Sequence, residues 1–290
     1  MRKLWVIAAF MGSTTGTAWA QVPSLPPDAL VFGCGAREKV EAEASAQLAR
    51  AVASPAEQEE HRNAARAAIR KADALRRDAL AGKPAEAPYS GASRFAALSV
   101  RAPSPELAEL YRRVAADQFA RLHLTAALQR VGWAAGLSDH ARSYAYYVIA
   151  SDVCGVDEAN TRWLKAQLDR SGWFTVSKYG AEADSAAWLL VQHADDDLAF
   201  QTRVLAILEA LVGSKDTDPR NYAYLYDRVA VNGKRPQRYG TQGRCTVSGS
   251  WEPREIEDPA RLDERRGAVG LEPEAEYRAR FTCPKAPPRG

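Results

Sequence analysis

The fold is decided by the stretch AAWLLVQH, residues 186–193, which is apolar on nearly all sides until its last two residues. A segment that offers no polar face must be buried all round, so it predicts a helix at the centre of a helical domain. Gln192 and His193 end this helix at positions that look buried, and three aspartates follow at 195–197. We expect Asp196 or Asp197 to cap the next helix.

Helical patterns continue from this stretch in both directions along the chain. Before it, apolar spacing and start signals predict helices over 105–131, 139–149 and 157–170; after it, they predict helices over 197–212 and from residue 219. Two later segments, 238–247 and 250–256, predict a β-hairpin, and a short helix is expected over 259–267. The predicted fold class is therefore mainly α with a small antiparallel β-hairpin near the C-terminus (α+β).

An N-terminal helical hairpin is predicted over residues 35–81. Its two helices are separated at Ser54, and Ser54-Pro55-Ala56-Glu57 combines a capping residue, a proline at the first helical position and a capping-box glutamate. Large apolar residues are few here, so the hairpin is expected to pack through alanines; a loosely ordered helical appendage is the alternative. Residues 82–104 are rich in Pro, Gly, Ala and Ser and predict a linker, which leaves 105–283 as the main domain.

The first twenty residues have the pattern of a secretory signal peptide. Arg2 and Lys3 precede a short apolar run at 4–10, and Ala18-Trp19-Ala20 supplies a cleavage site before Gln21. The apolar run is too short to span a bilayer. We therefore expect an exported protein, periplasmic or secreted, without an integral membrane anchor, and with an extended Pro-rich arm over 21–34.

The four cysteines predict disulfide bonds, because their number is even and the expected compartment is oxidising. Of the three connectivities, we favour Cys34–Cys154 and Cys245–Cys283, since each would tie a chain end to the body beside it. No two cysteines are close in sequence, and the four histidines are scattered. No metal site and no cofactor is predicted.

The charge balance excludes one class of partner. The chain has 39 Lys and Arg residues against 36 Asp and Glu; removal of Arg2 and Lys3 with the leader leaves 37 against 36, a net charge of +1. Nucleic-acid binding depends on a broad basic field, which this balance does not provide.

Polar residues occupy several positions where the helical pattern expects apolar ones. Asp117, Gln118 and Arg121 fall on the apolar face of the predicted helix over 105–131. Burying such groups costs several kcal/mol unless they are paired. Either Asp117 and Arg121 form an internal pair that pins neighbouring helices, or this face lines a polar cavity. Further polar clusters come later in the chain: Asp227-Arg228, Gln237-Arg238-Tyr239-Gly240-Thr241-Gln242 and Arg265-Arg266.

Two of these motifs carry a resemblance to a known family. Gln192-His193-Ala194-Asp195 and Tyr239-Gly240-Thr241-Gln242, in this order and with the other polar clusters, resemble an uncharacterised bacterial domain family marked by Gln-His-Ala-Asp and Tyr-Gly-Thr-Gln. The resemblance covers about residues 105–278 and brings no established activity with it. It implies that these clusters belong to one domain.

Three functional hypotheses follow, and the sequence leaves the choice, the substrate and the oligomeric state open. The first is an exported hydrolase or lyase acting on a cell-envelope or peptide-like substrate, with His193 as general base oriented by Asp117 or Asp195. The second is a non-catalytic module that binds an anionic small molecule or a peptide terminus. The third is a structural protein whose hairpin over 35–81 docks a protein partner. Binding residues would come from Gln118, Arg121, Gln192, Asp227, Arg228, Tyr239, Thr241, Gln242 and Arg266.

Overall fold

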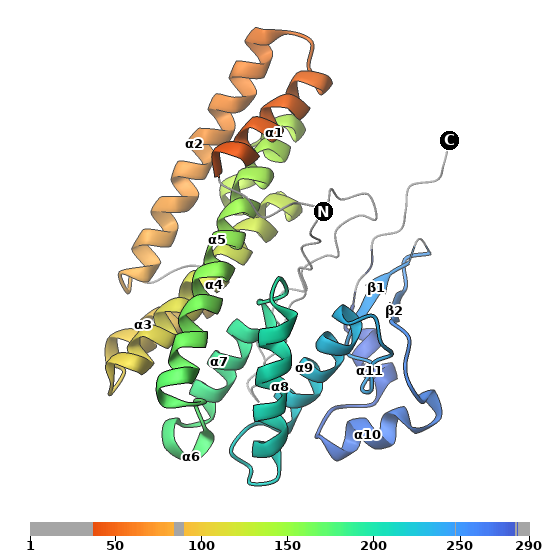
Figure 1. Ribbon diagram of the computed structural model, residues 1–290. Coiled ribbons are helices and arrows are strands. Elements are labelled where there is room, and N and C mark those ends of the chain that lie inside the picture. Colours follow the sequence, from red (N-terminus) through yellow and green to blue (C-terminus); the bar gives the residue numbers. More distant parts are fainter. Residues whose placement is uncertain (1–36, 84–89, 247, 282, 284–290) are drawn as a thin grey trace. The chain divides into compact units, whose positions relative to one another are not determined.

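The computed structural model describes residues 37–83, 90–246, 248–281 and 283. These residues form mostly helices with one two-stranded antiparallel sheet near the C-terminus, which confirms the predicted fold class (Figure 1). The chain divides into two compact units, which are described separately below. The N-terminal unit ends at Asn160, and the C-terminal unit begins at Thr161.

The N-terminal unit begins with the predicted helical hairpin, formed by α1 (Arg37–Ala51) and α2 (Pro55–Leu80). The Ser54 hydroxyl accepts a hydrogen bond from the backbone N–H of Glu57 at 3.4 Å, as the capping sequence predicts. Both alanines and larger apolar residues are buried in the two helices. The alanines are Ala44, Ala65, Ala72 and Ala79, and the larger residues are Val40, Leu48 and Ile69.

A helix that the sequence did not predict lies inside the expected linker at 82–104. Helix α3 (Ser90–Arg101) packs against α4 (Pro105–Gln129), and Phe95 is almost completely buried. Burying an aromatic ring of this size stabilises the helix by roughly 2–3 kcal/mol, which outweighs the weak propensity of the surrounding Ser and Gly residues. The composition of 82–104 favours a linker because Phe95 is the only aromatic residue of α3, and its other fully buried residues, Ala92 and Ala96, are small.

Helix α4 begins at the predicted position. Ser104 accepts a hydrogen bond from the N–H of Leu107 at 3.3 Å, and Pro105 takes the first helical position. The helix ends at Arg130, whose φ of 58° places it in the left-handed conformation, and a short 3-10 turn, η1 (Gly132–Ala134), follows.

One long helix, α5 (Asp139–Ser171), replaces the two helices predicted over 139–149 and 157–170. Its middle contains Gly155, which costs about 1 kcal/mol in a helix interior and favours a break. Val153 and Cys154 are buried just before it, so packing keeps this turn helical. Because the unit boundary follows Asn160, α5 contributes residues to both compact units.

The C-terminal unit contains four further helices before the sheet: α6 (Val176–Tyr179), α7 (Ala181–Gln192), α8 (Leu198–Val212) and α9 (Pro219–Asn232). Residues 186–192 of α7 are all buried, as the apolar stretch predicts. Asp197 caps α8 by accepting a hydrogen bond from the N–H of Phe200 at 3.0 Å, which confirms the expected cap.

The β-hairpin is shorter than predicted. Strands β1 (Gly243–Cys245) and β2 (Trp251–Pro253) pair antiparallel with Arg244 opposite Glu252. The preceding residues 238–242, expected to extend the first strand, instead form a loop around a buried carboxylate. The chain then continues through η2 (Pro259–Arg261), α10 (Leu262–Ala268) and α11 (Glu274–Ala279); the predicted helix over 259–267 corresponds to η2 and α10.

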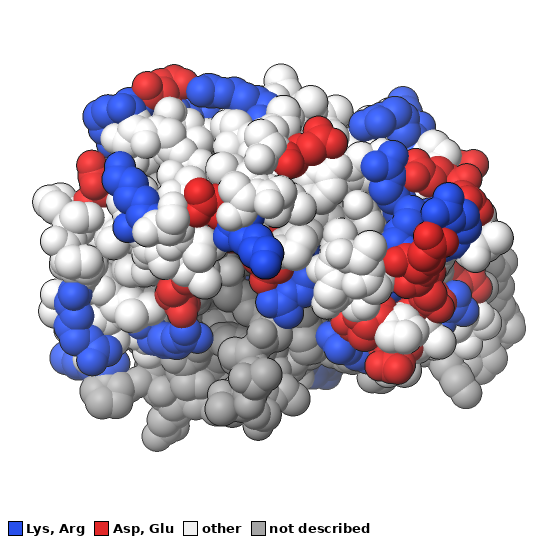
Figure 2. All heavy atoms as spheres, turned by 90° about the horizontal axis from the view of Figure 1, so that it is seen from below, with Lys and Arg blue, Asp and Glu red and all other residues white. Residues whose placement is uncertain are grey.

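The surface of the described residues carries both signs of charge. Lys and Arg side chains are interspersed with Asp and Glu over the face in Figure 2. Among the described residues, no helix combines the length and apolar character needed to cross a bilayer.

Candidate functional site

The predicted site residues are divided between the two units. Asp117, Gln118 and Arg121 belong to the N-terminal unit, and the others, including His193 and Asp227, belong to the C-terminal unit. A single site that unites both groups stays a prediction.

In the N-terminal unit, Asp117 is the centre of a buried polar cluster. Its carboxylate accepts hydrogen bonds from Gln118 Nε2 at 2.8 Å and from Arg121 Nε at 3.2 Å. Arg121 also donates through Nη2 to Asp157 of α5 at 2.6 Å. The internal Asp117–Arg121 pair that the sequence suggested is therefore present. Asp157, which sequence analysis used only as a helix start, extends this cluster from α4 to α5.

In the C-terminal unit, the end of α7 places Gln192 and His193 at buried positions, with 4% and 7% of their surface exposed. The backbone N–H of His193 closes the helix by donating to Leu190 O at 3.2 Å. Both side chains thus lie at the end of a helix whose residues 186–192 are all buried.

Arg228 of α9 connects to this helix end. Its Nε donates to Oε1 of Gln192 at 3.1 Å and lies 3.5 Å from Oδ1 of Asp195. The arginine side chain is only 4% exposed. Three residues that the sequence predicted as site members therefore form one cluster, the Gln192–Asp195–Arg228 cluster, in which Gln192 and Arg228 are buried and the Asp195 side chain is 19% exposed.

Asp195 is held by α8 and α9. Its Oδ1 accepts hydrogen bonds from Gln201 Nε2 and Asn232 Nδ2, both at 3.1 Å. Among the described residues, no hydrogen bond joins Asp195 to His193, so the geometry gives no support to Asp195 as the group that orients this histidine. The catalytic roles of His193, Asp117 and Asp195 stay predictions.

The Gln192–Asp195–Arg228 cluster contains side-chain N–H donors that have no hydrogen-bond acceptor among the described residues. Gln192 Nε2 is buried and has no hydrogen-bond partner. The described residues likewise offer no hydrogen bond to Nη1 or Nη2 of Arg228, which contacts Gln192 and Asp195 through Nε alone. The amide orientation of Gln192 is fixed, because a flipped amide would turn its NH₂ group toward the Arg228 N–H. Three nitrogen donors, Gln192 Nε2 and Arg228 Nη1 and Nη2, therefore lack an acceptor among the described residues at this place.

Asp227, also on α9, binds the loop at 237–242. Its Oδ1 accepts from the backbone N–H groups of Arg238 and Tyr239 at 2.7 and 2.9 Å, and its Oδ2 accepts from N and Oγ1 of Thr241 at 2.8 and 2.9 Å. Burial raises the pKa of Asp227 to about 6, although all four hydrogen bonds act in the opposite direction. The bonds it makes are those of a loop anchor.

The loop is closed by further buried polar contacts. Gln237 donates to the carbonyls of Gln242 and Arg254 at 2.8 and 2.9 Å and accepts from the Gln242 N–H at 2.8 Å. Gly240 has a φ of +66°, a conformation that suits glycine. Gln242 Nε2 donates to Thr241 Oγ1 at 3.1 Å, which leaves the predicted binding residues Thr241 and Gln242 engaged with their neighbours.

The buried Arg266 of α10 is hydrogen-bonded to the same loop. It is fully buried, donates through Nη1 to Tyr239 O and through Nε to Glu272 O, both at 2.6 Å, and lies over the Tyr277 ring at 4.9 Å. Tyr277 in turn donates to Thr241 O at 3.1 Å. Arg266, predicted as a ligand contact, thus has two backbone carbonyls as its partners.

Sequence analysis missed a third buried aspartate, Asp184. Asp184 of α7 accepts hydrogen bonds from Trp173 Nε1 at 2.7 Å, Thr217 Oγ1 at 2.8 Å, the Asp218 N–H at 3.1 Å and Asn221 Nδ2 at 2.9 Å. Burial raises the pKa of this carboxyl above its ordinary value. The only sequence signal was an acidic residue in the first turn of a helix, which is common on exposed helices.

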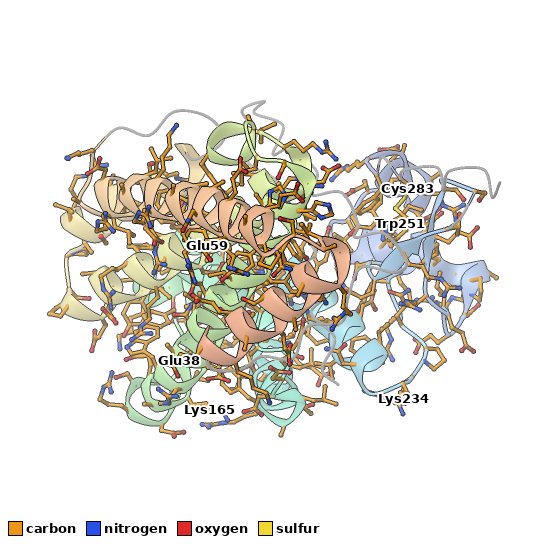
Figure 3. All side chains as sticks on the ribbon, turned by 90° about the horizontal axis from the view of Figure 1, so that it is seen from above. Glu38, Glu59, Lys165, Lys234, Trp251 and Cys283 are labelled. Atoms are coloured by element: carbon orange, nitrogen blue, oxygen red, sulfur yellow. A yellow bond between two sulfur atoms is a disulfide. The ribbon has the colours of Figure 1, made fainter. Side chains whose placement is uncertain are left out.

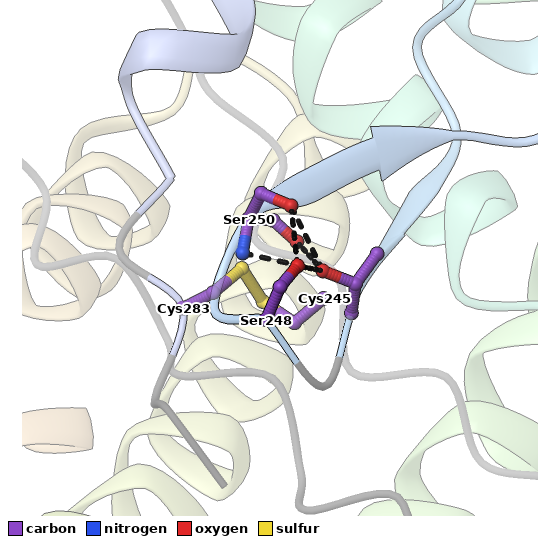
Figure 4. The surroundings of a disulfide bond; sticks show 5 residues. Cys245, Ser248, Ser250 and Cys283 are labelled. Atoms are coloured by element: carbon purple, nitrogen blue, oxygen red, sulfur yellow. Dashed lines mark hydrogen bonds between the residues drawn. A yellow bond between two sulfur atoms is a disulfide. The ribbon is translucent and has the colours of Figure 1, made fainter.

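The predicted Cys245–Cys283 disulfide is present and joins β1 to the segment after α11 (Figure 4). Trp251 packs beside it, as the labels in Figure 3 show, together with Tyr277. The hydroxyls of Thr246 and Ser250 are 2.8 Å apart at the hairpin turn next to the bridge. Cys154 is buried on α5, but its predicted partner Cys34 lies outside the described residues, so the second bridge stays a prediction.

Comparison with protein families gives one finding. A family of unknown function, DUF6624, matches residues 107–282, more than half of the chain. The chain belongs to the DUF6624 family. The DUF6624 match includes the Asp117 cluster, the Gln192–Asp195–Arg228 cluster and Cys245; it begins after the α1–α2 hairpin and ends one residue before Cys283. Comparisons with curated proteins and with solved structures give no significant match.

Proposed function

We propose that this DUF6624 protein binds a carboxylate-bearing ligand at the Gln192–Asp195–Arg228 cluster. The observation that carries the proposal is the buried Gln192 Nε2, which has no hydrogen-bond partner, beside the two terminal nitrogens of Arg228, which have no acceptor among the described residues. A buried donor without a partner, as Gln192 Nε2 is, costs about 1–3 kcal/mol. A ligand oxygen that accepts from these groups removes this cost.

The geometry of the arginine favours a carboxylate. Gln192 and Asp195 contact only the Nε side of the Arg228 guanidinium, so its Nη1 and Nη2 atoms form an unoccupied fork. A guanidinium fork binds the two oxygens of a carboxylate through parallel hydrogen bonds. Asp195 also balances part of the positive charge before the ligand arrives, which favours a singly charged group over a phosphate dianion. We therefore name a small carboxylate or the C-terminus of a peptide as the ligand.

Isothermal titration of the full chain with N-acetyl-alanyl-alanine tests this proposal, with the C-terminal amide of the same compound as the uncharged probe. We expect saturable binding of the acid and none of the amide. In Gln192→Glu, a second carboxylate replaces the free donor and pairs with Arg228, so we expect the affinity for the acid to fall at least tenfold without loss of the fold. Inorganic phosphate should bind more weakly than the acid.

The matched control is Arg203→Gln on α8, because Arg203 is half-exposed and pairs with Asp169 at 2.7 Å on the surface. It should bind the acid as the wild type does, whereas Arg228→Gln should not. Equal binding of the acid and the amide, or unchanged binding by Gln192→Glu, would overturn the proposal. Circular dichroism of each variant separates a lost ligand contact from a lost fold.

We also propose that the protein is exported. The Cys245–Cys283 disulfide supports this, since structural disulfides persist mainly in oxidising compartments. The leader pattern at 1–20 lies outside the described residues and remains a sequence prediction. N-terminal sequencing of the protein recovered from a cell-envelope extract of an expressing bacterium should give Gln21 as the first residue; an intact Met1 in cytosolic protein alone would contradict the proposal.

A further inference from the structure

Two histidines of the N-terminal unit lie next to each other although 79 residues separate them in sequence. His61 is on α2 and His140 is in the first turn of α5, and their ring centroids are 5.4 Å apart with the rings tilted by 52°. His140 is exposed and His61 is half-buried, so both can be reached from solvent. Sequence analysis treated these histidines as scattered because only the folded unit brings α2 and the start of α5 together.

Ser138 holds one of the two rings. Its Oγ lies 3.1 Å from Nδ1 of His61 and also accepts a hydrogen bond from the Ala141 N–H at 3.2 Å. With this hydroxyl as the acceptor for the Nδ1 proton, the lone pair of His61 is on Nε2. Metal-binding histidines are commonly oriented in this way, with the second ring nitrogen donating to a neighbouring oxygen.

We propose that His61 and His140 form a binding site for a divalent transition-metal ion, Zn²⁺ or Cu²⁺. Imidazole nitrogen is a preferred ligand of both ions. Zinc–nitrogen bonds of about 2.0–2.1 Å at a tetrahedral angle place two ligating nitrogens about 3.3 Å apart, which two rings at the observed centroid distance can achieve. Water would fill the other coordination positions.

The neighbouring carboxylate is already engaged. Asp139 lies between Ser138 and His140 in sequence, and its Oδ1 pairs with Arg130 Nη2 at 2.6 Å and with Arg142 Nη2 at 3.1 Å. The two imidazoles are therefore the protein ligands in this proposal. An ion bound by both would tie α2 to α5 and stabilise the N-terminal unit, because the unfolded chain does not hold the two rings together.

Zinc titration of the untagged full chain, freed of metal with EDTA and dialysed, tests the site. We expect calorimetry to show one equivalent of Zn²⁺ whose affinity falls at least tenfold in His61→Ala and in His140→Ala. Cu²⁺ at one equivalent should give an electron paramagnetic resonance spectrum with nitrogen hyperfine coupling that the double variant lacks. Asp139→Asn should leave the affinity within about threefold, since this carboxylate is not a ligand here.

His123→Gln is the matched control, because His123 is a buried histidine of the same unit and lies on α4. It should bind Zn²⁺ as the wild type does. Zn²⁺ should raise the melting temperature of the wild type and not that of the His61→Ala/His140→Ala double variant, whose melting temperature without metal reports whether it folds. A double variant that folds and keeps the same zinc equivalent would overturn the proposal.

Discussion

Asp227 shows how a buried charge can be used to organise a loop. Both of its oxygens accept two hydrogen bonds, and three of the four donors are backbone N–H groups. In Asp227→Asn, the side-chain NH₂ would face the donors of Thr241 or of residues 238 and 239. We expect the free energy of unfolding to fall by about 2–4 kcal/mol, measured by urea denaturation. Asp169→Asn, at an exposed aspartate of α5, should change it by less than about 0.5 kcal/mol.

His123 should make the N-terminal unit sensitive to acid. Burial lowers the pKa of this imidazole from 6.5 to about 4, with the nearby Arg76 acting in the same direction. As the pH falls below 6.5, the unfolded chain takes up a proton that the folded chain takes up only near pH 4. The free energy of unfolding should therefore fall across this window by on the order of 3 kcal/mol and then level off.

His123→Gln removes this titration. Urea unfolding of wild type and variant between pH 7.5 and 4 should give curves that converge or cross as the pH falls, because only the wild type loses the contribution of a neutral histidine. Parallel pH dependences in the two proteins would show that His123 is not the group responsible.

At the residue scale, the burial of polar groups could be predicted from the sequence, whereas most of their hydrogen-bond partners could not. Asp117, Asp227 and Arg228 all stood out against an apolar pattern, and all three are buried. Asp184 did not stand out, because its partners Trp173 and Asn221 are 11 and 37 residues away and meet it only in the fold. Unpaired donors such as Gln192 Nε2 depend on side-chain geometry and cannot be found from residue spacing.

At the scale of single elements, glycines provide a matched pair of tests. A Cβ on Gly243 of β1 would lie 2.2 Å from the Trp251 ring and 2.5 Å from the carbonyl oxygen of Glu252, whereas a Cβ on Gly267 of α10 would meet nothing within 4 Å. Gly243→Ala should destabilise the protein by about 2–4 kcal/mol, because the hairpin must open or the ring must move. Gly267→Ala should be neutral or stabilising by up to about 1 kcal/mol.

Thermal and urea unfolding measure both variants, and near-ultraviolet circular dichroism reports whether Trp251 keeps its packing. If Gly243→Ala were as stable as the wild type, β1 and β2 would not pair as the structure describes.

The first residues of the helices were the features best predicted from the sequence. Capping residues with a following proline or a short polar run marked the beginnings of α2, α4, α8 and α9, because these signals act within one turn. Helix α3 and the unbroken course of α5 were not predicted. In both, packing of a few residues such as Phe95 and Val153 overrides a local composition that favours a linker or a break.

At the scale of the whole chain, the Cys245–Cys283 disulfide ties the last described residue to the β-hairpin across 38 residues. Closing a loop of this length lowers the entropy of the unfolded chain, which corresponds to about 4 kcal/mol in the chain-entropy treatment. The Cys245→Ala/Cys283→Ala double variant should therefore lose about 2–4 kcal/mol of unfolding free energy. A reductant should lower the unfolding free energy of the wild type and so reduce its difference from the double variant. Identical urea midpoints for the oxidised wild type and the double variant would contradict this account.

The overall fold class could be predicted because helical periodicity and one late hairpin signal dominate the sequence. The division into compact units could not, since it falls within a continuous helix and no change in composition marks residue 160. The hairpin over 35–81 was predicted from its caps and alanines, while its role as a docking element stays a prediction.

Because α5 is one continuous helix, insertions and deletions within it have effects along its whole length. Each residue added to a helix turns the residues after it by about 100° and moves them by about 1.5 Å. An inserted codon near Gly155 would change by about 100° the angle around the helix axis between the buried side chains of Leu164 and Leu168 and those of Tyr144 and Val148. Insertions and deletions should thus accumulate in exposed connections such as 213–215, while the 33-residue length of α5 is passed on unchanged.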